Sequence, residues 1–134
     1  MNVKEAFAKA GIYPKTNPGE VWKASDSAIT LLDRITRRWH KERYCVILSN
    51  KETCDDPDWP LVLIAPLTHE LYPKPRADLI VEVTQTNGLA MPSRIILSQI
   101  QPLQKISLQE RLGEISITKW EQILKQVFWQ ISRK

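Results

Sequence analysis

A basic stretch with interleaved aromatic and imidazole side chains lies between residues 34 and 43. Five positive charges stand there against the single carboxylate of Glu42: Arg34, Arg37, Arg38, Lys41 and Arg43. Guanidinium and ammonium groups bind phosphate oxygens, and a ring such as that of Trp39 can stack on a base, as in sites for single-stranded nucleic acids. The stretch therefore indicates binding of a phosphate backbone. The alternative is a solvated basic face without a partner, because basic runs are common.

Two residues suited to proton chemistry follow an apolar run. Residues 61–67 are almost continuously apolar, which predicts a strand buried on both faces. Pro66 has no backbone N–H, so it should mark a strand end or a bulge. Thr68 and His69 then lie where the chain leaves the sheet, a place where sites are commonly built. For His69 the alternative is a partly exposed loop histidine without a role.

The strands that must position these side chains can be read from β-branched and aromatic runs. A first strand is predicted to begin with Val21, Trp22 and Ala24, and residues 44–48 are predicted as a second. Residues 78–84 should pair with 93–97 as a hairpin whose loop holds Asn87-Gly88. Residues 25–42 are predicted as a helix-containing loop. In such a helix Trp39 would lie one turn from Ile35 and could belong to the core.

Helices are expected near both ends of the sequence. Residues 2–10 form an amphipathic pattern that Asn2 can cap and Gly11 can end. Two capping-box pairs should each start a helix: Ser107 with Glu110, and Thr118 with Glu121. The last helix carries an apolar stripe that we expect to pack on the sheet as core: Trp120, Ile123, Leu124, Val127, Phe128 and Ile131. Trp129 lies off that stripe and is a candidate contact for a partner.

The order of these segments resembles the PemK/MazF family of bacterial toxins. The resemblance rests on the stretches Pro18-Gly19-Glu20-Val21-Trp22, Arg43-Tyr44-Cys45-Val46-Ile47-Leu48-Ser49, Ile64-Ala65-Pro66-Leu67-Thr68 and residues 87–116. It implies a mainly β fold with flanking helices, an SH3-like β-barrel of the PemK/MazF/CcdB kind with an added N-terminal helix and a C-terminal helix. Residues 1–17 would form the N-terminal helical extension, and residues 18–134 one toxin domain.

The resemblance also implies a function. Such a toxin is a metal-independent, sequence-selective endoribonuclease for single-stranded RNA, in which the 2′-hydroxyl of the RNA attacks the adjacent phosphate. Arg43 matches the family's strand-opening arginine, and Thr68 matches its hydroxyl residue after the third strand. His69 stands where relatives often have serine or threonine, and its imidazole could act as base or acid near neutral pH. A homodimer and a cognate antitoxin protein are the implied partners.

Four residues of the basic stretch are expected to bind the RNA: Arg37, Arg38, His40 and Lys41. The chain departs from the family pattern at Tyr44, where a proline is usual, and at Gln104, where an aspartate is typical. Its loop over residues 25–42 is longer and lacks the family's glycine-rich, acid-containing sequence. Three carboxylates are candidates for the missing one: Asp26, Asp33 and Glu42. A barrel that has lost catalysis and binds nucleic acid or protein as a growth regulator is therefore the second hypothesis.

Composition sets the wider limits. The sequence has 134 residues, a formal net charge of +4 and 43% hydrophobic residues, and no apolar run approaches the roughly 20 residues of a membrane helix. We expect a single globular domain in the cytoplasm and no contact with a membrane. Cys45 falls in a predicted strand and Cys54 in an acidic loop, so two free thiols are expected. The two histidines stand apart from each other and from both cysteines, and we predict neither a metal nor a cofactor.

Overall fold

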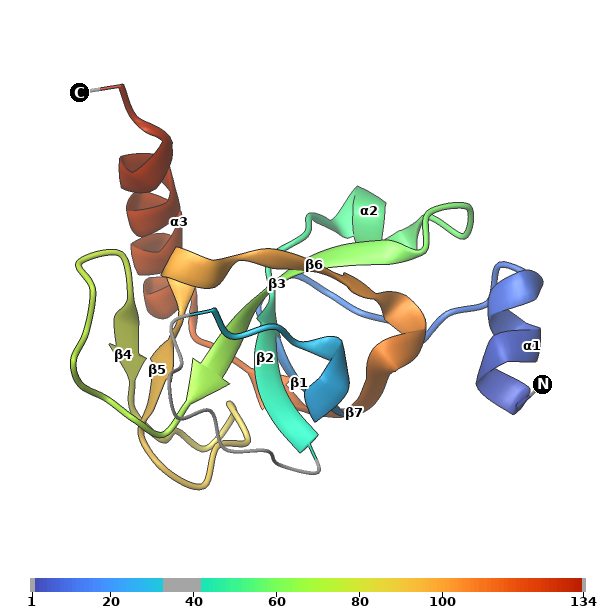
Figure 1. The fold of residues 1–134 in the computed structure, drawn as a ribbon, viewed down its shortest axis with the longest axis horizontal. Coiled ribbons are helices and arrows are strands. Elements are labelled where there is room, and N and C mark those ends of the chain that lie inside the picture. The colour runs from blue at the N-terminus through green and yellow to red at the C-terminus, as the bar shows by residue number, and fades with distance from the viewer. Residues whose placement is uncertain (1, 33–41, 134) are drawn as a thin grey trace.

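The computed structural model describes residues 2–32 and 42–133. In these residues seven antiparallel strands form one sheet with the order β4-β5-β3-β2-β1-β7, and β6 pairs with β3 beside this path (Figure 1). The strands are β1 Glu20–Ser25, β2 Glu42–Ile47, β3 Leu61–Thr68, β4 Leu79–Val81, β5 Ser93–Ile95, β6 Gln101–Gln104 and β7 Leu108–Glu114. The prediction of a mainly β fold with flanking helices is confirmed, although the sheet is open: its end strands β4 and β7 are not neighbours.

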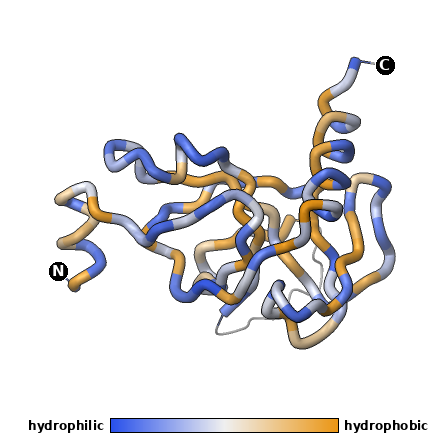
Figure 2. The backbone as a smooth tube through the Cα atoms, turned by 180° about the vertical axis from the view of Figure 1, so that it is seen from behind, coloured by the Kyte–Doolittle hydropathy of each residue, from blue (hydrophilic) through white to orange (hydrophobic). Residues whose placement is uncertain are grey.

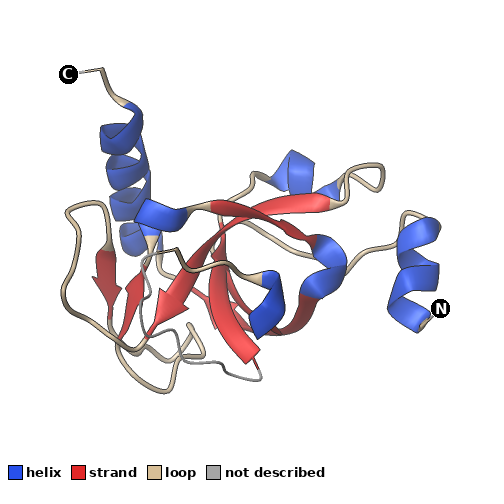
Figure 3. Cartoon of the chain, in the orientation of Figure 1, coloured by secondary structure: helices blue, strands red, loops and turns tan. Residues whose placement is uncertain are grey.

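Helices flank the sheet at both ends of the chain (Figure 3). The α-helices are α1 Val3–Lys9, α2 Lys51–Asp55 and α3 Ile117–Ile131, and short 3-10 helices span Asp26–Ala28, Leu97–Gln99 and Lys105–Ser107. The N-terminal helix begins as predicted, because the Asn2 side chain accepts a hydrogen bond from the Glu5 amide. Its apolar residues do not enter the core: Val3 and Phe7 are exposed, and no residue of α1 is buried. No helix in the described part of the chain is both long and apolar enough to span a membrane.

Alternation along the strands divides the core between the two faces of the sheet. Val21 and Val46 point to one face, and Trp22 and Cys45 to the other, as the period of two along a strand requires. α3 covers the first face through Ile123, which is 1% exposed. Figure 2 shows hydrophobic colour along the central strands and hydrophilic colour in many of the turns around them.

The central strand β3 exchanges partners along its length. Its first half, Leu61 to Ile64, pairs with β6, whereas Leu67 and Thr68 pair with β5. Pro66 lies between these two segments and still faces Cys45 of β2. We expected Pro66 to end the strand or form a bulge, and this was wrong, because the missing N–H falls where the ladder changes from one partner to the other.

The capping-box pair Ser107/Glu110 does not start a helix, which corrects the prediction. Residues 105–107 form one 3-10 turn, and β7 follows and pairs with β1. Gly113 shows why a strand wins here. A Cβ atom at Gly113 would lie 2.2 Å from the carbonyl oxygen of Thr86, so β7 fits closely against the turn before Gly88 only without a side chain. Tertiary packing thus overrides a local helix signal.

The last helix starts two residues earlier than predicted and buries less of its stripe. Ser116 is its N-cap and accepts from the Lys119 amide, whereas Thr118 lies within the first turn. Of the predicted core stripe, Trp120, Ile123 and Val127 pack against the sheet. The other three are exposed, namely Leu124 at 51%, Phe128 at 70% and Ile131 at 75%. The stripe is therefore wider than the surface that the sheet offers it.

Two further predictions have mixed outcomes. The hairpin of residues 78–84 with 93–97 is confirmed in β4 and β5, but β5 ends at Ile95 and a 3-10 turn follows it. Residues 26–28 form a 3-10 turn within the segment predicted as a helix-containing loop, and residues 33–41 lie outside the described residues.

Both thiols are free, as predicted. Cys45 is buried in β2, and burial raises the pKa of its thiol to about 12. Cys54 does not lie in a loop as expected, but on the buried side of the short helix α2, which begins at the Asn50 cap. Burial raises the pKa of the Cys54 thiol as well.

A buried lysine joins the second half of the chain to α2. Lys105 is fully buried, and its ammonium donates at 2.9 Å to the carbonyls of both Thr53 and Asp56. The ring of Tyr13 lies 5.1 Å away from the same ammonium. Burial lowers the pKa of Lys105. The lysine thus satisfies carbonyls at the C-terminal end of α2, which an isolated five-residue helix would leave to water.

Candidate active site

A pocket of about 400 Å³ opens at one end of the central strands. Residues of β2, the end of β3 with the following turn, and the first residue of β5 line it: Glu42, Arg43, Tyr44, Leu67, Thr68, His69, Glu70 and Ser93. Antiparallel pairing brings these residues together: Cys45 faces Pro66, so the start of β2 and the end of β3 lie at the same end of the sheet. The three residues predicted as catalytic, Arg43, Thr68 and His69, therefore lie around one pocket.

Arg43 is held by a buried carboxylate. Its Nε donates to Oδ1 of Asp26 at 2.5 Å, and the two side chains are only 10% and 4% exposed. The pairing arises because Ala24 of β1 faces Arg43 in the sheet, and the 3-10 turn after β1 brings Asp26 back over the strand end. A guanidinium in this setting has one orientation, and its charge is already matched by a carboxylate.

The hydroxyl of Thr68 is oriented by the turn that follows it. Its Oγ1 accepts a hydrogen bond of 3.2 Å from the amide of Glu70. A hydroxyl that accepts from the backbone keeps its own hydrogen for another acceptor. Thr68 can therefore donate to an oxygen atom of a ligand in the pocket.

His69 stands between an aromatic ring and a hydroxyl. Its ring meets that of Tyr44 edge to face at a centroid distance of 6.3 Å, and its Nδ1 lies 3.5 Å from Oγ of Ser93. The Ser93 hydroxyl donates to the carbonyl of Met91. The Ser93 oxygen thus favours a hydrogen on Nδ1 of His69, which leaves Nε2 as the nitrogen that can accept a proton.

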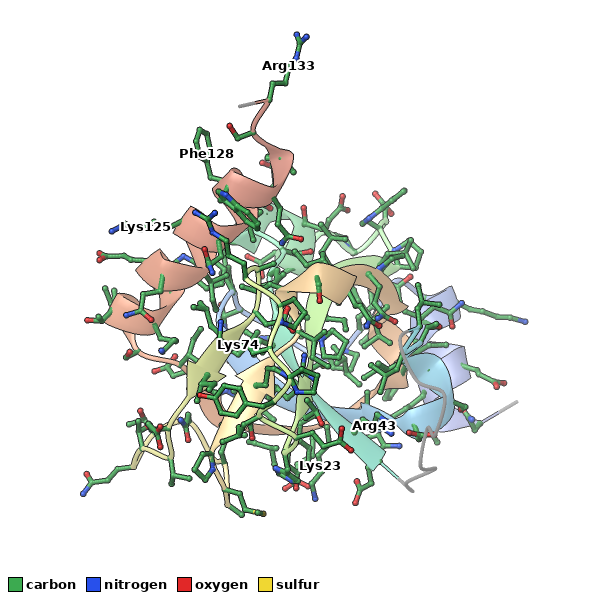
Figure 4. The ribbon with its side chains drawn as sticks, turned by 60° about the vertical axis from the view of Figure 1, so that its left-hand side comes forward. Lys23, Arg43, Lys74, Lys125, Phe128 and Arg133 are labelled. Atoms are coloured by element: carbon green, nitrogen blue, oxygen red, sulfur yellow. The ribbon has the colours of Figure 1, made fainter. Side chains whose placement is uncertain are left out.

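The charge around the pocket is mixed. Glu42 and Glu70 both line it. Lys23 balances part of this charge, because its ammonium lies 3.8 Å from Glu42 and 3.4 Å from Glu110. These two carboxylates raise the pKa of Lys23. Figure 4 labels Lys23 and Arg43 together at this end of the sheet, away from the residues labelled on α3.

The residues predicted to bind RNA are not placed. Arg37, Arg38, His40 and Lys41 lie outside the described residues, as do Trp39 and the candidate carboxylate Asp33. The other two candidate carboxylates separate in the structure. Asp26 is buried against Arg43, whereas Glu42 lines the pocket itself.

Sequence reasoning missed three residues of the pocket wall: Glu70, Ser93 and Tyr44, whose ring lies beside His69. Glu70 directly follows His69, so its place at the strand end was a usable signal. Ser93 had none, because only the pairing of Thr68 with Arg94 across β3 and β5 brings it to the pocket. Among the described side chains, no three of His, Cys, Asp and Glu gather as a metal site would require.

The sequence matches a family model over residues 18–130. This family is described as the PemK-like, MazF-like toxins of type II toxin-antitoxin systems. The sequence has no significant match among curated proteins.

Solved structures of similar fold cover most of the chain. The Mycobacterium tuberculosis toxin MazF-mt6 matches with a TM-score of 0.61 at 19% identity, over 81% of this chain and 92% of that one. An endoribonuclease from mycobacterial species matches with a TM-score of 0.62 at 15% identity, over 87% and 91%. A mycobacterial endoribonuclease in complex with its cognate antitoxin matches with a TM-score of 0.58 at 16% identity, over 86% and 91%.

Proposed function

Because this chain belongs to the family of PemK-like and MazF-like toxins of type II toxin-antitoxin systems, we propose that it is a toxin that cleaves single-stranded RNA without a metal, with sequence selectivity. The observation that carries the proposal is that Arg43, Thr68 and His69 line the same pocket. The endoribonucleases of similar fold are consistent with it. Cleavage of cellular RNA would take place in the cytoplasm.

The proposed reaction is an internal transfer at phosphorus. The 2′-hydroxyl oxygen of the RNA forms a bond to the adjacent phosphorus, and the bond from phosphorus to the 5′-oxygen breaks. The products are a 2′,3′-cyclic phosphate and a 5′-hydroxyl. The reaction needs a base for the 2′-hydroxyl proton, donors for the charge that develops on the phosphate oxygens, and an acid for the leaving oxygen.

The residues of the pocket suit these roles. Arg43, held in place by Asp26, and the hydroxyl of Thr68 would donate to the non-bridging oxygens. Nε2 of His69 would take the proton of the 2′-hydroxyl. Glu42 is the candidate for the second proton transfer, since it lines the same pocket.

Attraction of the RNA backbone must come from outside the described pocket. Its arginine is paired with Asp26, and two carboxylates line its wall. The basic stretch with Arg37, Arg38, His40 and Lys41 would supply that attraction. Binding of a single-stranded RNA should therefore weaken steeply as salt rises.

The test is cleavage of a long single-stranded RNA by the purified protein in EDTA, with R43A and the matched control R111A. Arg111 pairs with Glu20 outside the pocket. We expect discrete fragments from the wild type and R111A, and a rate lower by about 100-fold or more in R43A, as for loss of one preorganised donor. Absence of cleavage by the folded wild type would refute the proposal, and equal rates for the two variants would remove Arg43 from it.

A second candidate is a protein of this fold without catalysis that regulates growth by binding nucleic acid or protein. One observation favours protein binding. An apolar groove of about 470 Å³ runs between α3 and the sheet, and the exposed Leu124 and Ile131 form part of its wall. A homodimer and an antitoxin are the partners we propose for the molecule in either case. Growth inhibition that survives R43A but is lost in I131A, which changes the groove wall, would support this candidate over the nuclease.

A further inference from the structure

A buried ion pair that none of the proposed steps uses contacts the turn that lines the pocket. Arg94 of β5 and Asp78, just before β4, have side chains that are 3% and 0% exposed. Their atoms Nη1 and Oδ2 are 2.6 Å apart. Burying two charges costs free energy that their mutual attraction often only balances, so such a pair is weak as a source of stability and calls for another role.

The second oxygen of Asp78 fixes the pair to the chain. Oδ1 accepts from both the amide and the hydroxyl of Ser98, each at 2.9 Å. With both of its oxygens engaged, Asp78 holds the guanidinium of Arg94 in one position.

A different arm of the same guanidinium reaches the catalytic turn. Nε of Arg94 donates to the carbonyl of Glu70 at 2.9 Å, across 24 positions of sequence. Arg94 also faces Thr68 in the ladder of β3 with β5. The residues on both sides of His69 are thus fixed by Arg94, Thr68 through the backbone and Glu70 through its carbonyl.

We propose that Arg94 is a positioning residue, which Asp78 holds so that it fixes the turn carrying His69 into the pocket. The inference rests on the proposed nuclease function for its kinetic consequence, but not for its structural one. Arg94 touches no ligand in this scheme. It acts through the direction of the His69 ring and of the Thr68 hydroxyl.

The variant that separates this role from simple stability is R94K. A lysine keeps a positive charge beside Asp78, but its single nitrogen cannot reproduce the two-armed contact with Asp78 and Glu70. The matched control is R111K, because Arg111 also makes an Nε contact to a buried carboxylate, Glu20, at 2.6 Å and lies outside the pocket.

The first readout needs no RNA cleavage. The chain has two histidines, so the Cε1–H signal of His69 in a proton NMR spectrum is assigned by its retention in H40Q. We expect R94K to shift or broaden this signal while circular dichroism reports an intact fold, and R111K to leave it in place. An unmoved His69 signal in folded R94K would overturn the proposal.

The second readout is kinetic. On a short RNA with one mapped cut site we expect R94K to lower kcat by about 10- to 100-fold, the size of effect expected for a misplaced catalytic group, with KM changed by less than about threefold. R94K should lower kcat less in the H69A background than in the wild type, since part of its effect acts through His69. Equal kcat for R94K and R111K would contradict the proposal.

Two outcomes need separate treatment. If the wild type cleaves no RNA, the nuclease proposal fails and the NMR comparison still decides the role of Arg94. If R94K does not fold, S98A decides, because it removes only the hydroxyl donor to Asp78. If S98A keeps a native circular dichroism spectrum, a shift of its His69 signal from the wild-type position supports the proposal, and an unmoved signal rejects it.

Discussion

Arg43 illustrates how one side chain can be both structural and functional. Its guanidinium is oriented by Asp26, which is 4% exposed, yet the same side chain lines the open pocket. A rigid donor loses little entropy when a ligand binds, but its charge attracts that ligand less once a carboxylate sits beside it. At the scale of the residue, the ion pair with Asp26 fixes the orientation of the Arg43 guanidinium and reduces the positive charge that it presents to a ligand.

The variant D26N should separate the effect of the orientation of Arg43 from the effect of its charge. Asparagine keeps an acceptor for Nε of Arg43 but removes the negative charge of Asp26 beside its guanidinium. We expect the free energy of unfolding to fall by about 3 kcal/mol, the lower end for a broken buried pair. We also expect RNA binding to show a steeper dependence on salt, because the Asp26 carboxylate no longer competes with a phosphate for Arg43.

Urea unfolding and RNA binding at two salt concentrations measure both effects. D58N is the control, because Asp58 lies exposed in a turn. An unchanged salt slope for D26N would show that Arg43 does not meet the RNA backbone.

Glu20 predicts a dependence of stability on pH. Burial alone would raise the pKa of its carboxyl, but hydrogen bonds from Arg111, Trp22 and Asn17 outweigh burial and hold this pKa below its ordinary value of 4.5. The ionised form is therefore favoured by folding. Its stabilisation is complete above pH 4.5 and is lost as the pH falls through the lowered pKa.

E20Q tests this directly by urea unfolding at several pH values. The variant should be less stable than the wild type at pH 7, and the difference should shrink as the pH falls below 4.5. E114Q is the control, since the Glu114 side chain is 61% exposed and its carboxylate lies 3.8 Å from Arg111, beyond hydrogen-bond distance. A difference that stays constant down to acid pH would contradict the account.

At the scale of the elements, α3 has one face buried against the sheet and another face exposed. Ile123 is 1% exposed and its neighbour Leu124 is 51% exposed. We expect I123A to lower the free energy of unfolding by about 2 to 4 kcal/mol through a cavity in the core, and L124A by less than about 1 kcal/mol.

Urea unfolding at two protein concentrations measures both variants. An L124A cost as large as that of I123A, and dependent on concentration, would mean that the groove beside α3 is covered by a second chain in solution. The contrast between adjacent residues thus reports on the homodimer proposal as well as on the helix.

Strands were more predictable from sequence than the later elements. β1, β2 and β3 follow from apolar and β-branched runs, because burial on both faces leaves a clear pattern. β7 did not follow, since Ser107 and Glu110 imitate a helix start while Gly113 and the pairing with β1 decide for a strand. Local signals fail where a distant strand provides the competing contacts.

The candidate site was predictable in part for the same reason. The resemblance indicated Arg43 and Thr68, and strand ends indicated Thr68 and His69. The supporting residues Asp26, Ser93 and Arg94 come close to the site because of the registers in which β1 pairs with β2 and β3 pairs with β5. No local pattern specifies such a register, because it depends on how two distant segments align.

At the scale of the whole molecule, α1 lies apart from the sheet, at the opposite end from α3 (Figure 1). Its described contact with the body includes the Lys4 ammonium, which donates to the carbonyl of Leu108 at 2.7 Å. The segment after it is more firmly attached, because Thr16 is 1% exposed and Tyr13 lies against Lys105. We therefore propose that residues 12–17 support the toxin domain and that α1 is the separable part of the extension.

Removal of residues 1–10 should confirm this division. We expect the free energy of unfolding to fall by less than about 1 kcal/mol, since α1 buries no residue and one partly exposed hydrogen bond contributes about that much. Thermal and urea unfolding of the shortened chain provide the measurement, with Y13A in the full chain as the comparison that should cost more. A larger loss on truncation than in Y13A would place α1 within the cooperative unit.

The buried Lys105 has a consequence for how the native molecule meets chemical reagents. Acylating agents reach lysines through solvent, and trypsin must draw the chain into an extended form around the basic side chain it recognises. Lys105 offers neither approach, because its ammonium is enclosed between the carbonyls of Thr53 and Asp56. Acylation or tryptic cleavage at this position would mark chains that have opened, and the unmodified peptide would measure the fraction that is still native.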